Sequence, residues 1–210
     1  MSRIYPGGTG TFSKSASQFP ANAPSHAVSG DGAHTLYEDG RQYLDWTCAL
    51  GAVSLGQMPG WVKRIQARFS GGVLFGSPTL LEEEYAADLA QILPWGPNDS
   101  ATKFGLHGYD VTDLAAWLAR YITGRDRIYS IDYHGSGLTY GPNKNGIPRA
   151  ISALTLEIWD APSSKAGALL IIEADKIADP DLHAMRAWCD ASGTLLCFDE
   201  MLTGFRTPGC

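Results

Sequence analysis

The first hundred residues contain two stretches in which apolar residues recur at helical spacing. From Leu81 to Ile92 they fall three or four residues apart and Pro94 follows, which predicts a helix over residues 80–93. Residues 59–70 have the same spacing and predict another helix. We place both helices in an N-terminal region over residues 1–100.

The residues before these helices predict an arm and a hairpin. Residues 1–30 are rich in Gly, Ser, Ala and Pro, and we expect an extended arm with little structure of its own. The next segment, "AHTLYEDGRQYLDWT", alternates around Asp39-Gly40, which is a strong short-range hairpin signal. It predicts antiparallel strands at about 33–37 and 42–46.

From about residue 103 the pattern changes to alternating strands and helices. The segments "ATKFGLHG", "RIYSIDYHG", "AGALLIIEAD" and "TLLCFDE" predict strands, while "DVTDLAAWLARYITG" and "DPDLHAMRAWCDASG" predict helices. This alternation predicts a mostly parallel α/β sheet within residues 101–210. The runs "ALLII" and "TLLCF" are almost wholly apolar, as in strands covered on both faces. Residues 136–166 are rich in Gly, Pro and Asn and predict a long loop.

Composition and charge narrow the classes of function. The 210 residues are 44% hydrophobic and 18% charged, which fits a globular protein with a real core. The net charge is -6 and no basic block occurs, so neither nucleic acid nor an anionic membrane surface is expected as a partner. Neither a signal peptide nor a membrane span is visible, so we expect a cytoplasmic protein. Scattered histidines and the absence of a C-x-x-C spacing argue against a metal site.

Three polar groups follow predicted strands, where ligands bind in open α/β sheets. The first is "GLHGYDVTD", residues 105–113, where a glycine turn enters a helix. Free backbone N–H groups and the helix dipole at such a point favour a phosphate. An ordinary helix cap made by Thr112 and Asp113 is the alternative.

The other two groups are "DYHG", residues 132–135, and Asp199-Glu200 after "TLLCF". An aromatic ring and a histidine can stack on a flat ligand, whereas the alternative is a buried tyrosine and a surface histidine. A carboxylate at the end of a buried strand is costly to desolvate unless it is paired. A cationic ring nitrogen of a cofactor would be such a partner, and a helix cap or a salt bridge to Arg206 is the alternative.

Together and in this order, these segments resemble class III pyridoxal-phosphate-dependent aminotransferases of fold type I, in the glutamate-1-semialdehyde aminomutase-like branch. The resemblance runs almost end to end. "GDGAHTLYEDGRQYLDWTCALGAVSLG" is similar to the N-terminal segment of that family. "LARYITGRDRI", "YHG" and "FDEMLTGFR" are similar to its "R-L-A-R-x-x-T-G-R-x-K-I", "Y-H-G" and "F-D-E-V-x-T-G-F-R". The T-G-R and F-D-E matches are the specific ones.

The resemblance implies the fold, a partial fold-type-I large domain, and a role for each matching residue. Asp199 would pair with the pyridine nitrogen of pyridoxal phosphate and keep it protonated. Tyr133 would stack on the ring, with His134 beside it. The cofactor phosphate would be held by backbone N–H groups at the helix start, those of Gly108, Tyr109 and Asp110. The implied activity is the transfer of an amino group.

Several residues depart from the family pattern. Tyr109 replaces a small residue where the backbone approaches the phosphate closely, and its bulk could block that approach. The family's E-P is Glu173-Ala174 here, and its L-G-H is Leu55-Gly56-Gln57. Leu50 takes the place of an aromatic residue that lies near the substrate in the aminomutases.

The family's catalytic lysine follows the F-D-E motif by a few tens of residues, and no lysine follows Asp199 in this sequence. We therefore assign no catalytic residue. The lysines present are Lys14, Lys63, Lys103, Lys144, Lys165 and Lys176. Only Lys176 is close to a predicted strand end, and its use as a substitute nucleophile would require a rebuilt geometry.

Three hypotheses follow from the sequence. The first is an aminotransferase- or aminomutase-like protein, inactive alone, that forms a homo-oligomer or is completed by a lysine-bearing second polypeptide. The second is a non-catalytic relative that binds pyridoxal phosphate without covalent attachment, or serves as an interaction or structural module. The third is a fragment without a separate function. The substrate would be a small amino or keto compound that the sequence does not identify further.

Overall fold

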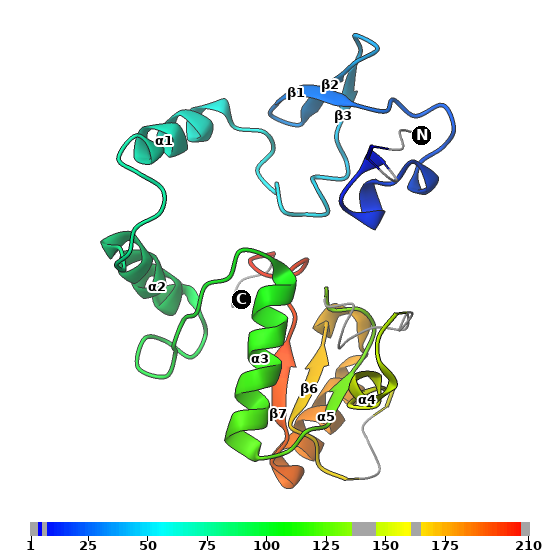
Figure 1. Cartoon of the computed structure of the whole chain (residues 1–210), viewed down its shortest axis with the longest axis vertical. Coiled ribbons are helices and arrows are strands. Elements are labelled where there is room, and N and C mark those ends of the chain that lie inside the picture. The colour runs from blue at the N-terminus through cyan, green and yellow to red at the C-terminus, as the bar shows by residue number, and fades with distance from the viewer. Residues whose placement is uncertain (1–3, 6–7, 136–145, 161–164, 207–210) are drawn as a thin grey trace. The chain divides into compact units, whose positions relative to one another are not determined.

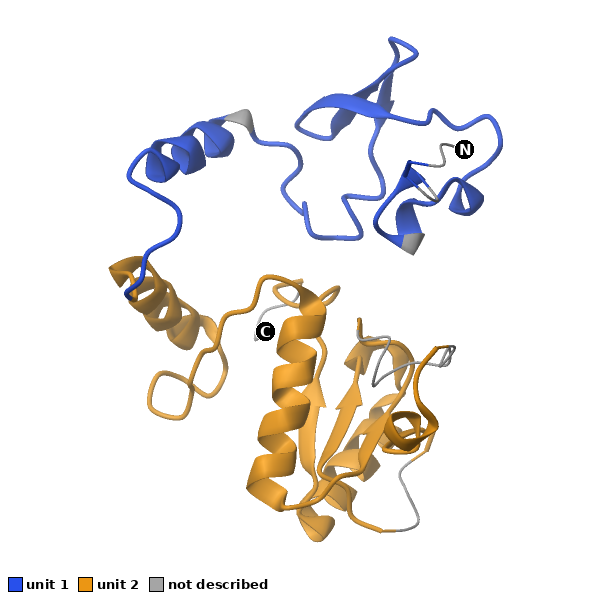
Figure 2. Cartoon of the chain, in the orientation of Figure 1, with its two compact units in different colours: residues 1–77 blue, residues 78–210 orange. Residues whose placement is uncertain are grey.

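The computed structural model describes residues 4–5, 8–135, 146–160 and 165–206 (Figure 1). The chain divides into two compact units, residues 1–77 and residues 78–210 (Figure 2). The boundary after residue 100, between an N-terminal region and a cofactor-binding domain, stays a prediction. Within the described residues, no helix is long and apolar enough to cross a membrane.

The first unit contains a small antiparallel sheet in the order β1-β2-β3. Its strands are β1 (Ala27–Asp31), β2 (His34–Tyr37) and β3 (Gln42–Leu44). The pairing of β2 with β3 confirms the predicted hairpin, and Gly40 takes the left-handed φ of 77° in the turn. The expected arm over residues 1–30, with little structure of its own, contains the short 3-10 turns η2 (Phe12–Lys14) and η3 (Ala16–Gln18). Strand β1 corrects this expectation, because it pairs with β2.

The glycine of the Leu55-Gly56-Gln57 segment is required by a close backbone approach in the first unit. Gly32 and Gln57 exchange two backbone hydrogen bonds of 2.8 and 2.7 Å. A Cβ on Gly56, whose φ is +77°, would lie 2.4 Å from the carbonyl oxygen of Gly32. Only glycine fits both constraints. Helix α1 (Pro59–Phe69) follows, which confirms the predicted helix.

The second unit is built on a parallel four-stranded sheet in the order β5-β4-β6-β7. This confirms the predicted α/β class. Its strands are β4 (Ile128–Ser130), β5 (Thr155–Glu157), β6 (Leu169–Ile172) and β7 (Leu195–Phe198). Strand β5 and the short helix α4 (Arg149–Ser152) correct the expectation of a loop over residues 136–166, of which 136–145 and 161–164 lie outside the described residues.

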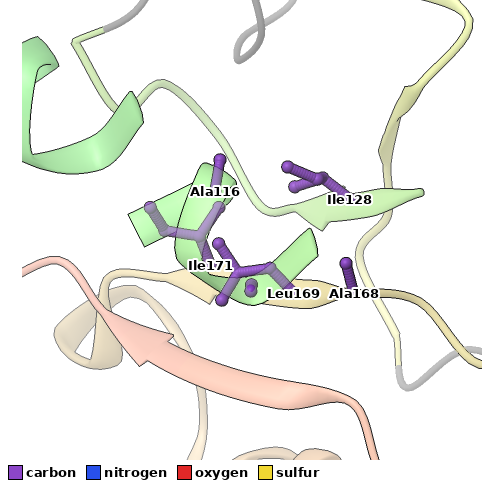
Figure 3. Packing of buried hydrophobic residues seen from close by; sticks show 6 residues of the cluster. Ala116, Ile128, Ala168, Leu169 and Ile171 are labelled. Carbon is purple, nitrogen blue, oxygen red and sulfur yellow. The ribbon is translucent and has the colours of Figure 1, made fainter. Parts of the chain in front are cut away.

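Two helices cover opposite faces of this sheet because strand side chains alternate between its faces. Helix α3 (Gly108–Thr123) packs Ala116 and Ala119 against Ile128, Leu169 and Ile171 (Figure 3). On the other face, α5 (Asp179–Ser192) packs Met185 and Cys189 against the intervening strand residues, Tyr129, Leu170 and Ile172. The remaining elements of this unit are α2 (Leu80–Ile92) and the turn η4 (Ala174–Lys176).

Two predicted strands differ from the structure. Residues 101–105 form no strand, because this stretch is largely exposed and pairs with no neighbouring strand among the described residues. Strand β6 is buried along its whole length, as predicted, but β7 is not. Leu195 and Phe198 of β7 are exposed, because β7 is the last strand in the sheet order.

The T-G-R segment anchors three parts of the second unit. Gly124 ends α3 in the left-handed conformation, with φ 65°, as is common for a helix C-cap. The Nη1 of Arg125 then donates to the carbonyl oxygens of Gly167, at 3.0 Å, and of Gly193, at 2.9 Å. Arg125 thus ties the end of α3 to the segment before β6 and to the end of α5, which is a structural role.

Candidate functional site

Polar side chains gather at the carboxyl edge of the parallel sheet in the second unit. Residues 132–135 follow β4, Glu173 follows β6 and Asp199 follows β7. The Asp199 amide donates to the carbonyl oxygen of Ile172, at 2.8 Å, so the last two strands stay paired up to this point. Because all four strands run parallel, their carboxyl ends meet at one edge, where open α/β sheets bind ligands.

His134 and Asp199 form a hydrogen-bonded pair at this edge. The Nδ1 of His134 lies 2.9 Å from Oδ2 of Asp199, and its Nε2 lies 2.7 Å from the carbonyl oxygen of Ile131. His134 is only 2% exposed, so the alternative of a surface histidine is wrong. The structure therefore joins two residues that sequence analysis had placed in separate groups.

The hydrogen bonds around Asp199 determine its ionisation. The hydrogen bond from His134, and secondly the one from the Met201 amide, holds the pKa of Asp199 below its ordinary value. Asp199 is thus ionised at neutral pH. The two ring nitrogens of His134 are both engaged, Nδ1 with the Asp199 carboxylate and Nε2 with the Ile131 carbonyl. The arrangement is a buried imidazole hydrogen-bonded to an ionised carboxylate.

Tyr133 lies next to this pair and keeps an accessible ring. It is 54% exposed, so the alternative of a buried tyrosine is wrong. Its hydroxyl donates to the carbonyl oxygen of Gly135, at 3.1 Å. The neighbouring Asp132 has a φ of 67°, and its Oδ1 accepts a hydrogen bond from the Tyr133 amide at 2.8 Å. The turn after β4 is therefore held by its own polar groups while it presents an aromatic ring.

The start of α3 belongs to the same site. A Cβ on Gly135 would lie 3.6 Å from the backbone nitrogen of Tyr109, and a Cβ on Gly108 would lie 3.2 Å from Sδ of Met201. The segments after β4 and β7 thus both touch the first turn of this helix. The three groups predicted from sequence converge at one place.

The backbone N–H groups of this first turn differ in their availability. Within the described residues, those of Gly108 and Tyr109 have no hydrogen-bond acceptor. The amide of Asp110 donates to the carbonyl oxygen of His107, at 3.1 Å. The Asp110 carboxylate accepts from the amides of Leu106 and His107 and so caps the helix. Two free donors at a helix N-terminus suit a phosphate, and a role for Asp110 stays a prediction.

The side chain of Tyr109, which departs from the family pattern, is held by a ring contact. Its ring stacks on that of His107, with centroids 5.4 Å apart and planes at 14°. The side chain stays about half exposed. The Tyr109 side chain, which was expected to obstruct a phosphate, is therefore held against the ring of His107.

A charged network borders the site on the side of β6. The Nζ of Lys176 lies 2.9 Å from Oδ2 of Asp132 and 3.0 Å from Oε2 of the buried Glu173. The hydrogen bond to Asp132, above all, raises the pKa of Lys176, while the same bond lowers the pKa of Asp132. Lys176 is therefore protonated and paired with two carboxylates, which argues against a role as nucleophile.

Two other kinds of site, a metal centre and a cysteine nucleophile, do not suit the groups at this sheet edge. One ligand atom each from His134, Glu173 and Asp199 lies within 4.8 Å of the others. A metal bound to His134 would have to break one of its existing hydrogen bonds, because its two ring nitrogens are already engaged with Asp199 and with the Ile131 carbonyl. Burial raises the pKa of the Cys197 thiol to about 11, so it stays protonated at neutral pH.

Several curated proteins that resemble this chain are named glutamate-1-semialdehyde 2,1-aminomutase. It is 32% identical over 236 residues to a glutamate-1-semialdehyde 2,1-aminomutase of Natronomonas pharaonis, covering 98% of this chain and 52% of that protein. It is 33% identical over 220 residues to the same enzyme of Halobacterium salinarum, covering 90% of this chain and 49% of that protein. The chain is homologous to these curated aminomutases over about half of their length. No family model matches it.

Solved structures of class III enzymes have the same fold. The chain matches the FumI protein of Sphingopyxis sp. MTA144 with a TM-score of 0.84 at 23% identity, over 97% of this chain and 54% of that one. It matches a glutamate-1-semialdehyde aminomutase of Pseudomonas aeruginosa with a TM-score of 0.73 at 20% identity, over 89% of this chain and 47% of that one. The chain spans about half the length of the class III proteins that it matches.

Proposed function

We propose that this chain forms the cofactor-holding part of a pyridoxal-phosphate-dependent enzyme of the aminotransferase or aminomutase class. The observation that carries the proposal is the ionised Asp199, held by His134 at the sheet edge beside the start of α3. A fixed carboxylate suits a cationic ring nitrogen, and the free amides of Gly108 and Tyr109 suit a phosphate. These donors and acceptors fit the two polar ends of pyridoxal phosphate.

Each residue has a distinct task in this proposal. When bound, pyridoxal phosphate supplies an electron sink for the carbon that carries the transferred amino group. Asp199 holds a proton on the pyridine nitrogen, and His134 keeps that carboxylate ionised and oriented. Tyr133 offers an accessible aromatic face for the ring. The backbone N–H groups of Gly108 and Tyr109 bind the phosphate.

We further propose that a second polypeptide supplies the lysine of the reaction. Within the described residues, the lysine closest to this edge, Lys176, is already paired with Asp132 and Glu173. Among the described residues, no strand pairs with the outer edge of β7, which is partly apolar, and α3 exposes Trp117 and Tyr121 on the side away from the sheet. Such surfaces suit coverage by another protein segment.

The cofactor part of the proposal is tested by titrating the purified chain with pyridoxal phosphate and with pyridoxal, using calorimetry. We expect D199N to weaken pyridoxal-phosphate binding by about 10- to 100-fold, since a hydrogen bond between charged groups is lost. Pyridoxal should bind far more weakly because it lacks the phosphate. The matched control is E200Q, which neutralises the neighbouring carboxylate and should change binding little. Equal affinities of wild type and D199N would contradict the proposal.

The partner part is tested with a polypeptide made from the part of the Pseudomonas aeruginosa aminomutase that this chain does not cover. After incubation with pyridoxal phosphate and borohydride, we expect stable labelling of a lysine on that polypeptide only when this chain is present. D199N should reduce the labelling. Labelling that does not depend on this chain would refute completion by a second polypeptide.

A non-catalytic binding protein is the second candidate, and the paired state of Lys176 favours it. It predicts tight, reversible binding of pyridoxal phosphate that borohydride never makes covalent on either polypeptide. The same labelling experiment therefore separates the two candidates.

A further inference from the structure

Two aromatic rings lie against each other at the start of α3, although neither belongs to the core. The ring of His107 stacks on that of Tyr109, with centroids 5.4 Å apart and planes at 14°. Tyr109 is 49% exposed, and the His107 side chain is 64% exposed. Packing of the core therefore does not account for the position of either ring, and the stack itself does.

His107 is fixed by a second contact, whereas Tyr109 is not. The Nδ1 of His107 lies 3.3 Å from Oδ2 of Asp110, and the same oxygen accepts the amide of His107 at 2.9 Å. The hydrogen bond from this amide, above all, lowers the pKa of Asp110, so its carboxylate is ionised at neutral pH. Within the described residues, the Tyr109 side chain makes no hydrogen bond, so the orientation of its ring depends on the stack.

The space in front of the Tyr109 amide is open because residue 135 is a glycine. A Cβ on Gly135, whose φ is +79°, would lie 3.6 Å from the Tyr109 nitrogen. A side chain there would lie against this free amide, and glycine leaves the room to a ligand. Side chains of a helix lean toward its N-terminus, so a Tyr109 ring released from the stack reaches over the amides of the first turn.

We propose that His107 is a positioning residue that holds the Tyr109 ring away from the free amides of Gly108 and Tyr109. This inference rests on the proposed function, because the ligand that needs these amides is the phosphate of the cofactor. His107 thereby keeps the phosphate end of the site accessible in a chain that has a large residue at position 109. A small residue at position 109 would make the stack unnecessary.

A double-mutant cycle of H107A and Y109S tests this role by calorimetric titration of the chain with pyridoxal phosphate. We expect H107A to weaken binding about three- to tenfold, the range that an aromatic pair contributes, because the released ring covers the amides. Y109S removes the ring, so it should bind at least as tightly as the wild type. In the Y109S background, loss of the histidine should therefore change binding by less than about twofold.

The variant H107F separates ring stacking from the hydrogen bonding of the imidazole. It keeps a flat ring against Tyr109 and should bind pyridoxal phosphate within about twofold of the wild type. Binding of pyridoxal, which lacks the phosphate, should change by less than about twofold in every variant. H183A removes an exposed histidine of α5 and is the matched control, which should bind as the wild type does. Urea unfolding of each variant checks that it is folded.

Several outcomes would overturn this role of His107. Equal losses from H107A in the wild-type and Y109S backgrounds would do so, because His107 would then act on the phosphate directly or through the fold of the helix start. So would an H107A chain that binds as tightly as the wild type, or an H107F chain that binds as weakly as H107A. These outcomes leave the proposed function intact, whereas a wild-type chain that binds no pyridoxal phosphate would overturn both.

Discussion

Asp132 is a strained residue that polar contacts hold in place. Its φ of 67° is unusual for a residue with a side chain and costs roughly 1–2 kcal/mol. Its carboxylate accepts from the Tyr133 amide and from Lys176, which offsets the strain. Because Lys176 also reaches Glu173, one cation joins the ends of β4 and β6. The orientation of the turn that carries Tyr133 and His134 thus depends on Lys176.

We therefore predict that K176A weakens pyridoxal-phosphate binding several-fold and lowers the free energy of unfolding by about 1–3 kcal/mol, because the buried Glu173 carboxylate loses its cation. The ion pair with Asp132 is well exposed, so its contribution to stability is small. The arginine variant K176R keeps the charge and should retain most of the binding. Calorimetric titration and urea unfolding measure the two effects. A K176A variant that loses stability but binds normally would show that Lys176 does not position the site.

At this scale the sequence identified the site residues but not their contacts. Asp199, Tyr133 and the α3 start were predicted from their places after strands. The pairing of His134 with Asp199 was not, because these residues are 65 positions apart and only strand order brings them together. For the same reason, the sequence left open that His134 lies on the surface, whereas it is buried.

At the scale of elements, the alternation of side chains in β4 and β6 decides which helix covers which face. Met185 of α5 is fully buried among Tyr129, Leu170 and Ile172. We predict that M185A lowers the free energy of unfolding by about 2–5 kcal/mol, because it leaves a cavity in this core. L118A, on the exposed side of α3, should stay within about 0.5 kcal/mol. Urea unfolding of both variants makes the comparison, and similar losses would contradict the assignment of the core.

Long, strongly patterned elements were predictable from the sequence, whereas two of the short strands were not. Helices α1, α2, α3 and α5 and strand β6 lie where their apolar periodicity placed them. Strands β1 and β5 were missed because five and three residues give little pattern, and their identity depends on a neighbouring strand. The strand expected near residue 103 is absent among the described residues because no neighbour pairs with it there.

For the whole molecule, the net charge of -6 and several carboxylates with lowered pKa values shape the response to acid. The folded-state pKa of Asp199 lies below its unfolded value, so its stabilising contribution is present above about pH 4 and is lost as pH falls through the folded pKa. Asp132 behaves in the same way. The contribution of these two carboxylates to the free energy of unfolding should therefore be constant between about pH 5 and 8.

We predict that the free energy of unfolding falls steeply below about pH 4 and that D199N shows a shallower fall, because one of the linked groups is gone. Urea unfolding from pH 3 to 7 measures both curves. E200Q is the matched control, because it removes the neighbouring carboxylate and keeps the His134–Asp199 hydrogen bond. Parallel curves for wild type and D199N would show that the His134–Asp199 pair is not linked to acid stability.

The strand order β5-β4-β6-β7 has a consequence for synthesis on the ribosome. His134 leaves the ribosome 65 residues before Asp199, which at ordinary translation speeds is a delay of roughly 3–13 s. During that interval the nascent sheet lacks the carboxylate that faces its buried imidazole. A ligand held by Asp199 can therefore recognise only chains in which β7 has emerged and paired. Its binding would draw newly made chains toward the completed sheet by mass action.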